Sequence, residues 1–205
     1  MRDLTLRRGA TAQGATTITI HGDEFENNIK AAVVRNITLT NSVIEDGNVS
    51  IMDGQGVTLS RLNLRSLPRF AHAPVLARNR IQNLRILDSV IERVTGSGPG
   101  NAIKISSQPG AGSVDALLSG VRVVQATTDA LVRTEQLARL VIVGMELVYT
   151  GPAQDEHAVV VVGNPAQPAE APVLVDTTVQ GQLAGAARVA GRFNGQPVLV
   201  RVTGP

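Results

Sequence analysis

The sequence predicts an all-β solenoid, in which short parallel strands stack coil upon coil. Three observations carry this prediction: one pattern recurs six times, a second strand-like segment recurs between its copies, and turn-forming residues separate them. The recurring pattern is apolar, variable, apolar, two polar or small residues, then apolar or small, variable, apolar. Its copies are residues 37–44, 57–64, 84–91, 116–123, 140–147 and, in degraded form, 173–180.

A second set of short segments lies between these copies, and its members also alternate apolar with other residues. They are residues 48–51, 74–77, 101–105, 129–133, 157–161 and 186–190. The segments that begin at Asn101, Asp129 and His157 are spaced by 28 residues each. We therefore expect these three side chains to form one column across three consecutive coils.

Alternation over three to five residues that are rich in Val, Ile, Leu and Thr favours strands over helices. Strong turn formers separate the segments, among them residues 46–48, 53–56, 96–100 and 151–152. The fixed Asn or Cys and the helical return of leucine-rich repeats are missing from the pattern. We predict a single-stranded right-handed parallel β-helix of about seven coils, with roughly 20–30 residues in each coil.

Two of the repeated units resemble the coil motif of the pectate-lyase-like β-helix family. They are Asn-Ala-Ile-Lys-Ile at residues 101–105 and Ile-Thr-Leu-Thr-Asn-Ser-Val-Ile at residues 37–44. The resemblance covers about residues 15–190 and implies the fold, but many unrelated functions share this scaffold. Lyases of this family use an arginine as base and carboxylates on the coils to hold Ca²⁺ against an acidic polysaccharide.

The composition favours one elongated domain over residues 1–205, with an N-terminal strand or arm at 1–15 and irregular C-terminal coils at 184–205. The chain is 43% hydrophobic but only 2% aromatic, and Val, Leu, Ile and Ala suit a narrow coil. It has no Cys, so it predicts neither disulfides nor thiolate chemistry. The formal net charge of +2 is small and does not indicate a surface for binding nucleic acid or membranes.

The two ends of the predicted solenoid show no convincing polar cap. The first nine residues hold no apolar run of a secretory signal, and the longest candidate helix, residues 24–32, is barely two turns long. Isolated solenoids need covered ends, because their core and strand edges are otherwise exposed. We expect a partner protein, an oligomer or further chain to cover at least one end.

Two columns of charged residues are the first candidate site. Aligning the repeats places Asn41, Arg61 and Asp88 in one column, and Glu45, Arg65 and Glu92 in another. If the protein is an enzyme, the resemblance points to Arg61, Asp88, Arg65 and Glu92 as the catalytic residues. The arginines lie among the carboxylates and neutralise them, so we interpret the columns as salt-bridged ladders and expect no metal or other cofactor.

The Asn101, Asp129 and His157 column is a weaker candidate. An Asp beside a His can orient a general base. Asn, Asp and His also suit tight turns, and we favour that interpretation. His21 and His72 have no nearby ligand partners in the sequence.

Carboxylate pairs for glycoside hydrolysis could also come from a second, acidic group of residues. The composition argues against a sugar-binding cleft, because the chain has no Trp and only one Tyr on which a sugar could stack. The acidic residues concerned are Asp23, Glu24, Glu26, Glu45, Asp46 and Asp53.

Two functions follow as hypotheses. The first is a non-enzymatic structural or attachment protein, such as a phage capsid decoration protein, head fibre, tailspike-like rod or surface appendage. It would lie at the virion or extracellular surface, as a homo-oligomer (a trimer) or bound to virion or appendage proteins through its ends. The alternative is a polysaccharide lyase, hydrolase or epimerase, and polysaccharide remains a possible ligand in either case.

Overall fold

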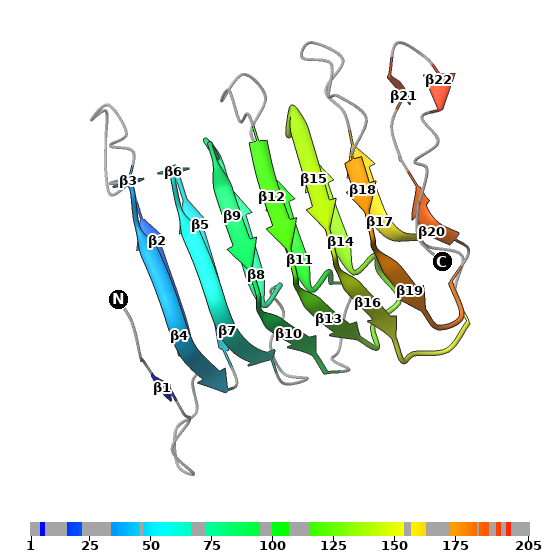
Figure 1. The fold of residues 1–205 in the computed structure, drawn as a ribbon, viewed down its shortest axis with the longest axis horizontal. Coiled ribbons are helices and arrows are strands. Elements are labelled where there is room, and N and C mark those ends of the chain that lie inside the picture. The colour runs from blue at the N-terminus through cyan, green and yellow to red at the C-terminus, as the bar shows by residue number, and fades with distance from the viewer. Residues whose placement is uncertain are drawn as a thin grey trace.

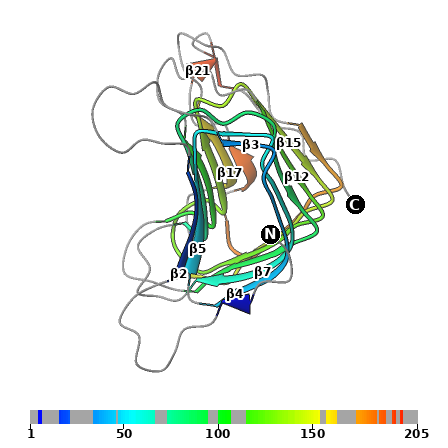
Figure 2. The ribbon, with the colours of Figure 1, turned by 90° about the vertical axis from the view of Figure 1, so that its left-hand side faces the viewer.

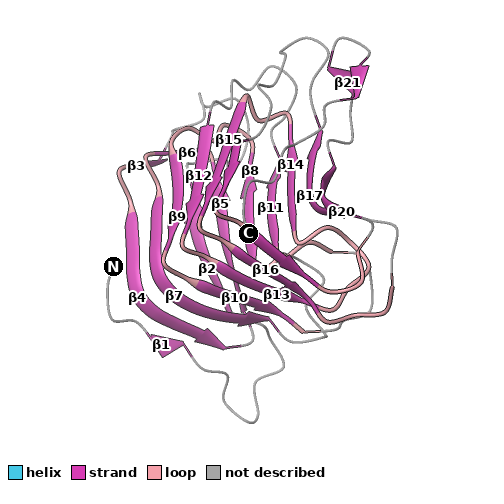
Figure 3. Cartoon of the chain, turned by 45° about the vertical axis from the view of Figure 1, so that its right-hand side comes forward, coloured by secondary structure: helices cyan, strands magenta, loops and turns pink. Residues whose placement is uncertain are grey.

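A computed structural model gives the fold. It describes residues 5–6, 16–21, 34–45, 47–66, 73–94, 100–106, 115–153, 157–162 and 173–183, and strands at 185–188, 192–193 and 196–197. For residues 5–6, 16–21, 34 and those beyond 184, only the backbone is described. The described residues form strands, turns and loops without a helix (Figure 3). The candidate helix at 24–32 and most of the two terminal segments lie outside them.

The larger sheet contains all six copies of the recurring pattern. In the first two copies one long strand spans the pattern, whereas each later copy divides into two strands. The eleven strands are β1 (Thr5–Leu6), β4 (Thr38–Glu45), β7 (Thr58–Ser66), β9 (Leu84–Leu87), β10 (Val90–Arg93), β12 (Asp115–Ser119), β13 (Arg122–Gln125), β15 (Arg139–Val143), β16 (Glu146–Tyr149), β18 (Val173–Val175) and β19 (Thr178–Gln180).

The second set of segments forms a separate seven-stranded sheet. Its strands, in the order in which they pair, are β2 (Thr16–His21), β5 (Gly47–Met52), β8 (Val75–Arg78), β11 (Ile103–Ser106), β14 (Val132–Glu135), β17 (His157–Val162) and β20 (Gly185–Arg188). Two short pairs complete the set: β3 (Val34–Arg35) with β6 (Gly54–Gln55), and β21 (Arg192–Phe193) with β22 (Gln196–Pro197).

Strand pairing is parallel throughout the described residues, except between β21 and β22. Successive copies of each segment lie side by side along the molecule, from β4 and β7 near one end to β16 and β19 near the other (Figure 1). Viewed along that direction, the two sheets curl around a common interior (Figure 2). The protein is therefore all-β, with parallel strands in curled sheets, an arrangement compatible with a β-helix.

The core consists of columns of aliphatic side chains that point into this interior. One column runs through six neighbouring strands, and all its members are buried: Leu39, Leu59, Ile86, Leu118, Ile142 and Leu174. Each such side chain contributes about 1.5–3 kcal/mol through burial. In the first five copies the third position of the sequence pattern thus becomes core, because strand side chains alternate between the two faces. The predicted alignment of the sixth copy is wrong by one residue: its second position, Leu174, joins the column, and Val173 and Val175 point outward.

The corners between strands are built from left-handed backbone conformations that also stack. Among the residues that the structure describes, nine non-glycine residues have positive φ, and seven of them are Asn or Asp, which tolerate this conformation best. They fall into three columns: Asn36 and Asn83 with Gly56; Asn41, Arg61, Asp88 and Asp176 with Gly120 and Gly144; and Asp53, Asn79 and Gln136. The two polar or small positions of the pattern are therefore the corner itself.

Candidate functional site

The first predicted column, Asn41, Arg61 and Asp88, is in register but serves as a backbone corner. Arg61 lies between the other two, and all three have φ between 47° and 52°. Its guanidinium donates from Nε to Asn41 Oδ1 and from Nη2 to Thr40 Oγ1 at 3.2 Å. The backbone N–H of Asp88 donates to Ser119 O on the next strand at 2.9 Å. Both residues therefore have a structural task.

Substitution of Arg61 should test this corner role. We expect Arg61→Val to lower the free energy of unfolding by about 1–2 kcal/mol, because a β-branched residue resists the left-handed conformation. Arg61→Asn should leave it within about 0.5 kcal/mol, because asparagine tolerates that conformation. Urea denaturation monitored by circular dichroism measures both.

Asn63, which is exposed on the same strand beside Val90, provides the matched control. Asn63→Val should cost little, since valine suits an outward strand position. Equal losses for Arg61→Val and Asn63→Val would contradict the corner role of Arg61.

The second predicted column, Glu45, Arg65 and Glu92, is also in register. Arg65 pairs with Glu45 on one neighbouring strand and with Glu92 on the other. Its Nε lies 3.3 Å from Glu92 Oε2, and both side chains are substantially exposed, at 54% and 39%. An exposed pair of this kind stabilises the sheet by about 0.2–1 kcal/mol.

The predicted column of Asn101, Asp129 and His157 is wrong in its register. The pairings of β11 with β14 and of β14 with β17 place Ala130 beside Asn101 and His157. Asp129 comes one residue earlier in the chain, so it is not their stacking partner. Instead Asn101 Nδ2 donates to the carbonyl oxygen of Ala130 at 2.7 Å. The coil between β11 and β14 is one residue longer than the spacing of polar residues suggested.

Only some of the remaining acidic and histidine residues singled out from the sequence lie within the described part of the chain. Asp53 is buried and pairs with Arg80 Nε at 2.8 Å, and Glu45 belongs to the second column. His21 ends β2. Among the described residues, no group of three or more His, Cys, Asp or Glu could hold a metal ion. Outside the described residues lie Asp23, Glu24, Glu26, Asp46 and His72.

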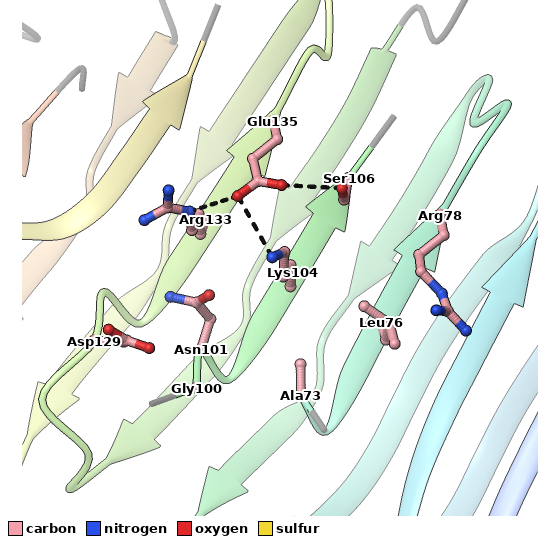
Figure 4. Close-up of a pocket in the computed structure, with 10 residues that line it drawn as sticks. All are labelled: Ala73, Leu76, Arg78, Gly100, Asn101, Lys104, Ser106, Asp129, Arg133 and Glu135. Carbon is pink, nitrogen blue, oxygen red and sulfur yellow. Dashed lines mark hydrogen bonds and ion pairs between the residues drawn. The ribbon is translucent and has the colours of Figure 1, made fainter. Parts of the chain in front are cut away.

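A polar groove on the second sheet is a feature that the sequence did not reveal. It has a volume of about 450 Å³ and crosses the outward faces of β8, β11 and β14 (Figure 4). Its lining is Ala73, Leu76, Arg78, Gly100, Asn101, Lys104, Ser106, Asp129, Arg133 and Glu135. This size lies within the range of ligand pockets in proteins.

Glu135 is the centre of the charged groups in this groove. Its Oε1 accepts from Arg133 Nε at 2.8 Å and lies 3.4 Å from Lys104 Nζ, while its Oε2 accepts from Ser106 Oγ at 3.0 Å (Figure 4). Burial alone would raise the pKa of Glu135, but the hydrogen bonds from Arg133 and Ser106 and the two positive charges outweigh it and lower the pKa. The carboxylate therefore stays ionised at neutral pH.

A buried arginine lies behind the other end of the groove. Arg93 is only 3% exposed, and its Nη1 donates to the carbonyl oxygen of Asn101 at 3.4 Å. Burial lowers the pKa of Arg93, and the charge of Asp129 raises it in part, so the net shift is downward. Asp129 is thus placed to balance a buried cation.

The groove could have been found by aligning outward residues rather than turn residues. Lys104 and Arg133 are neighbours in register, as are Ser106 and Glu135. The first pair follows from the alternation in residues 101–105 and 129–133 once the extra residue in that coil is known, and the second pair follows by continuing the alternation to residues 106 and 135.

Comparisons with known proteins gave no relative. No protein-family model matches the chain, and neither a curated protein nor a solved structure matches it. No helix in the described part of the chain is long and apolar enough to cross a membrane.

Proposed function

We propose that the chain is a single-stranded right-handed parallel β-helix of about seven coils, similar in fold to the pectate-lyase-like proteins, with a structural or attachment role. The corner column supports this proposal. Arg61 and Asp88, which the resemblance would make catalytic, hold left-handed turns and bond to neighbouring coils. Their outward neighbours Arg65 and Glu92 pair with each other.

In this proposal the protein is a rigid rod of a virion, as a capsid decoration protein, head fibre or tailspike-like segment, or of a surface appendage. Its partners would be copies of itself, as a trimer, or virion and appendage proteins at the ends of the solenoid. Val173 and Val175 on β18 support a partner, because these large apolar side chains are 47% and 37% exposed on the edge strand of the larger sheet.

An enzyme acting on polysaccharide is the second candidate, and the groove over β8, β11 and β14 favours it. The groove combines ionised, amide and hydroxyl side chains in a concavity that could take a sugar. A lyase, hydrolase or epimerase would then act through residues other than the corner column.

An activity screen and a mass measurement separate the two functions. The purified chain, Arg61→Ala and Asp88→Ala are incubated with acidic and neutral polysaccharides, and product is followed by chromatography. We expect no turnover by any of the three, and a native mass three times the 21.5 kDa of one chain. Turnover by the wild type would contradict the structural role. Turnover that Arg61→Ala or Asp88→Ala abolishes with unchanged circular dichroism would place it in the corner column, and turnover that both variants retain would favour the groove.

A further inference from the structure

Two columns of outward side chains meet in the groove on the second sheet. Arg78, Ser106 and Glu135 occupy equivalent positions on β8, β11 and β14. Lys104 and Arg133 form the neighbouring column on β11 and β14. Ser106 therefore lies between Arg78 and Glu135, with Lys104 on its own strand two residues earlier.

The contacts of Glu135 show what this part of the groove can hold. Two cations and a hydroxyl already surround its carboxylate: Arg133 and Lys104 at one oxygen and Ser106 at the other. These are charge-assisted hydrogen bonds, which are stronger than bonds between neutral groups. The cluster is thus a carboxylate-binding arrangement occupied by a side chain of the protein itself.

The cations keep unused donors for a second anion. An arginine has five N–H donors and a lysine has three. Within the described part of the chain, Arg133 gives only its Nε–H to Glu135, and the Lys104 ammonium contacts only Glu135. Among the described residues, the only partner of the Arg78 guanidinium is the sulfur of Met52, at 3.8 Å. Lys104 and Arg133 therefore place two positive charges around the negative charge of Glu135. Arg78, whose guanidinium points toward β5 and away from Ser106 (Figure 4), adds a third at the edge of the groove. Asp129 supplies a second negative charge at the far end, where the buried Arg93 offsets it.

We propose that the groove binds a carboxylate-bearing ligand over Ser106 through Lys104 and Arg133, with the exposed Arg78 side chain turning from β5 toward the ligand, and that Glu135 competes with this ligand for Lys104 and Arg133. A planar guanidinium matches a carboxylate in a bidentate contact, and two are present here. Asp129 at the far end of the groove presents a carboxylate to hydroxyl groups of the same ligand, whereas the buried Asn101 amide already donates to the Ala130 carbonyl oxygen. A small hydroxy acid, or the end of a larger acidic molecule, has this chemistry.

NMR titration of the full chain at pH 7 and low salt tests the proposal. The probes are gluconate, acetate and inorganic phosphate, with sorbitol as the analogue of gluconate that lacks a carboxylate. Gluconate should shift the side-chain signals of Arg78, Lys104 and Arg133, and sorbitol should not. Arg78→Met and Lys104→Met should each weaken gluconate binding about tenfold or more, as expected for the loss of one charge-assisted contact.

The direction in which Glu135→Gln changes the affinity for gluconate is the decisive result. It removes the competing charge and should tighten gluconate binding about three- to tenfold, whereas loss of a merely structural residue would weaken it. Arg122→Met is the matched control, since Arg122 pairs with Glu146 on the larger sheet, and it should change nothing. Circular dichroism confirms folding, and Arg78→Met keeps the test valid if Glu135→Gln is unstable, because the Arg78 side chain is exposed.

Three results would overturn the proposal. Equal weakening by Arg122→Met would show diffuse charge attraction rather than a site. Weaker or unchanged binding in folded Glu135→Gln would show that Glu135 does not compete. Phosphate binding in preference to gluconate would show that the groove does not select carboxylates. This proposal stands whether or not the rod belongs to a virion, because none of these results depends on oligomeric state or turnover.

Discussion

Leu118→Ala should lower the free energy of unfolding by about 2–5 kcal/mol, the largest effect that we expect from a single truncation. Leu118 is fully buried in β12, in the middle of the core column between Ile86 and Ile142. Coils on both sides hold the strand in place, so the cavity left by the missing atoms cannot close. Urea denaturation gives the value.

Leu117, the preceding residue, provides the matched control. It points to the outer face of the same strand and is only partly buried. Leu117→Ala should therefore cost much less than Leu118→Ala, within about 1 kcal/mol of the wild type. Similar losses for the two variants would contradict the assignment of inner and outer faces in β12.

Gly54→Ala should lower the free energy of unfolding by about 1–3 kcal/mol, because the site has no room for a side chain. A β-carbon at Gly54 would lie 2.7 Å from Ile51 Cγ2 and 2.8 Å from Val57 Cγ2. Both neighbours belong to the core and are fully buried. Thermal and urea unfolding measure the loss.

Gly144 provides the contrasting case, since its φ is +58° and no atom lies within 4 Å of an added β-carbon. Gly144→Asn should stay within about 0.5 kcal/mol of the wild type, because asparagine tolerates the left-handed conformation. A Gly54→Ala protein as stable as Gly144→Asn would show that the interior beside Gly54 is looser than the structure indicates.

The sequence was sufficient to predict the strands and much of their stacking. In the first five copies the third position of the recurring pattern forms a core column, such as Leu59 beside Ile86, because alternation in a strand separates inner from outer side chains. The degraded sixth copy is shifted by one residue, so its Val173 and Val175 point outward. The stacking of Arg61 between Asn41 and Asp88 also followed from this alignment. Its left-handed backbone was not predicted, since arginine is not a residue that favours that conformation.

The register of the second sheet was harder to predict because turn residues are not a reliable guide to it. Residue type predicts that Asp129 stacks on Asn101, but an extra residue in that coil places Ala130 there. Parallel register depends on the hydrogen bonds of each strand and on which face its apolar residues occupy. The type of side chain at a turn indicates neither the hydrogen bonds of a strand nor the face that its apolar residues occupy.

The groove was missed for a related reason. Lys104, Arg133 and Glu135 lie in two strands far apart in the sequence, and none of them belongs to a recognisable motif. Only the correct register brings Lys104 beside Arg133 and Ser106 beside Glu135.

Disulfide formation between two introduced cysteines tests the central claim, that repeated positions stack in parallel register. Arg122 and Glu146 are direct neighbours on β13 and β16, both pointing outward, and the chain has no native cysteine. The Arg122→Cys, Glu146→Cys protein should oxidise almost completely to an intramolecular disulfide, because neighbouring strands are about 4.8 Å apart. The Arg122→Cys, Val148→Cys protein should not, because two residues further along the strand the Cα atoms are about 8 Å apart. Failure of the first pair, or equal oxidation of the second, would contradict the register on which the core, the corners and the groove all depend.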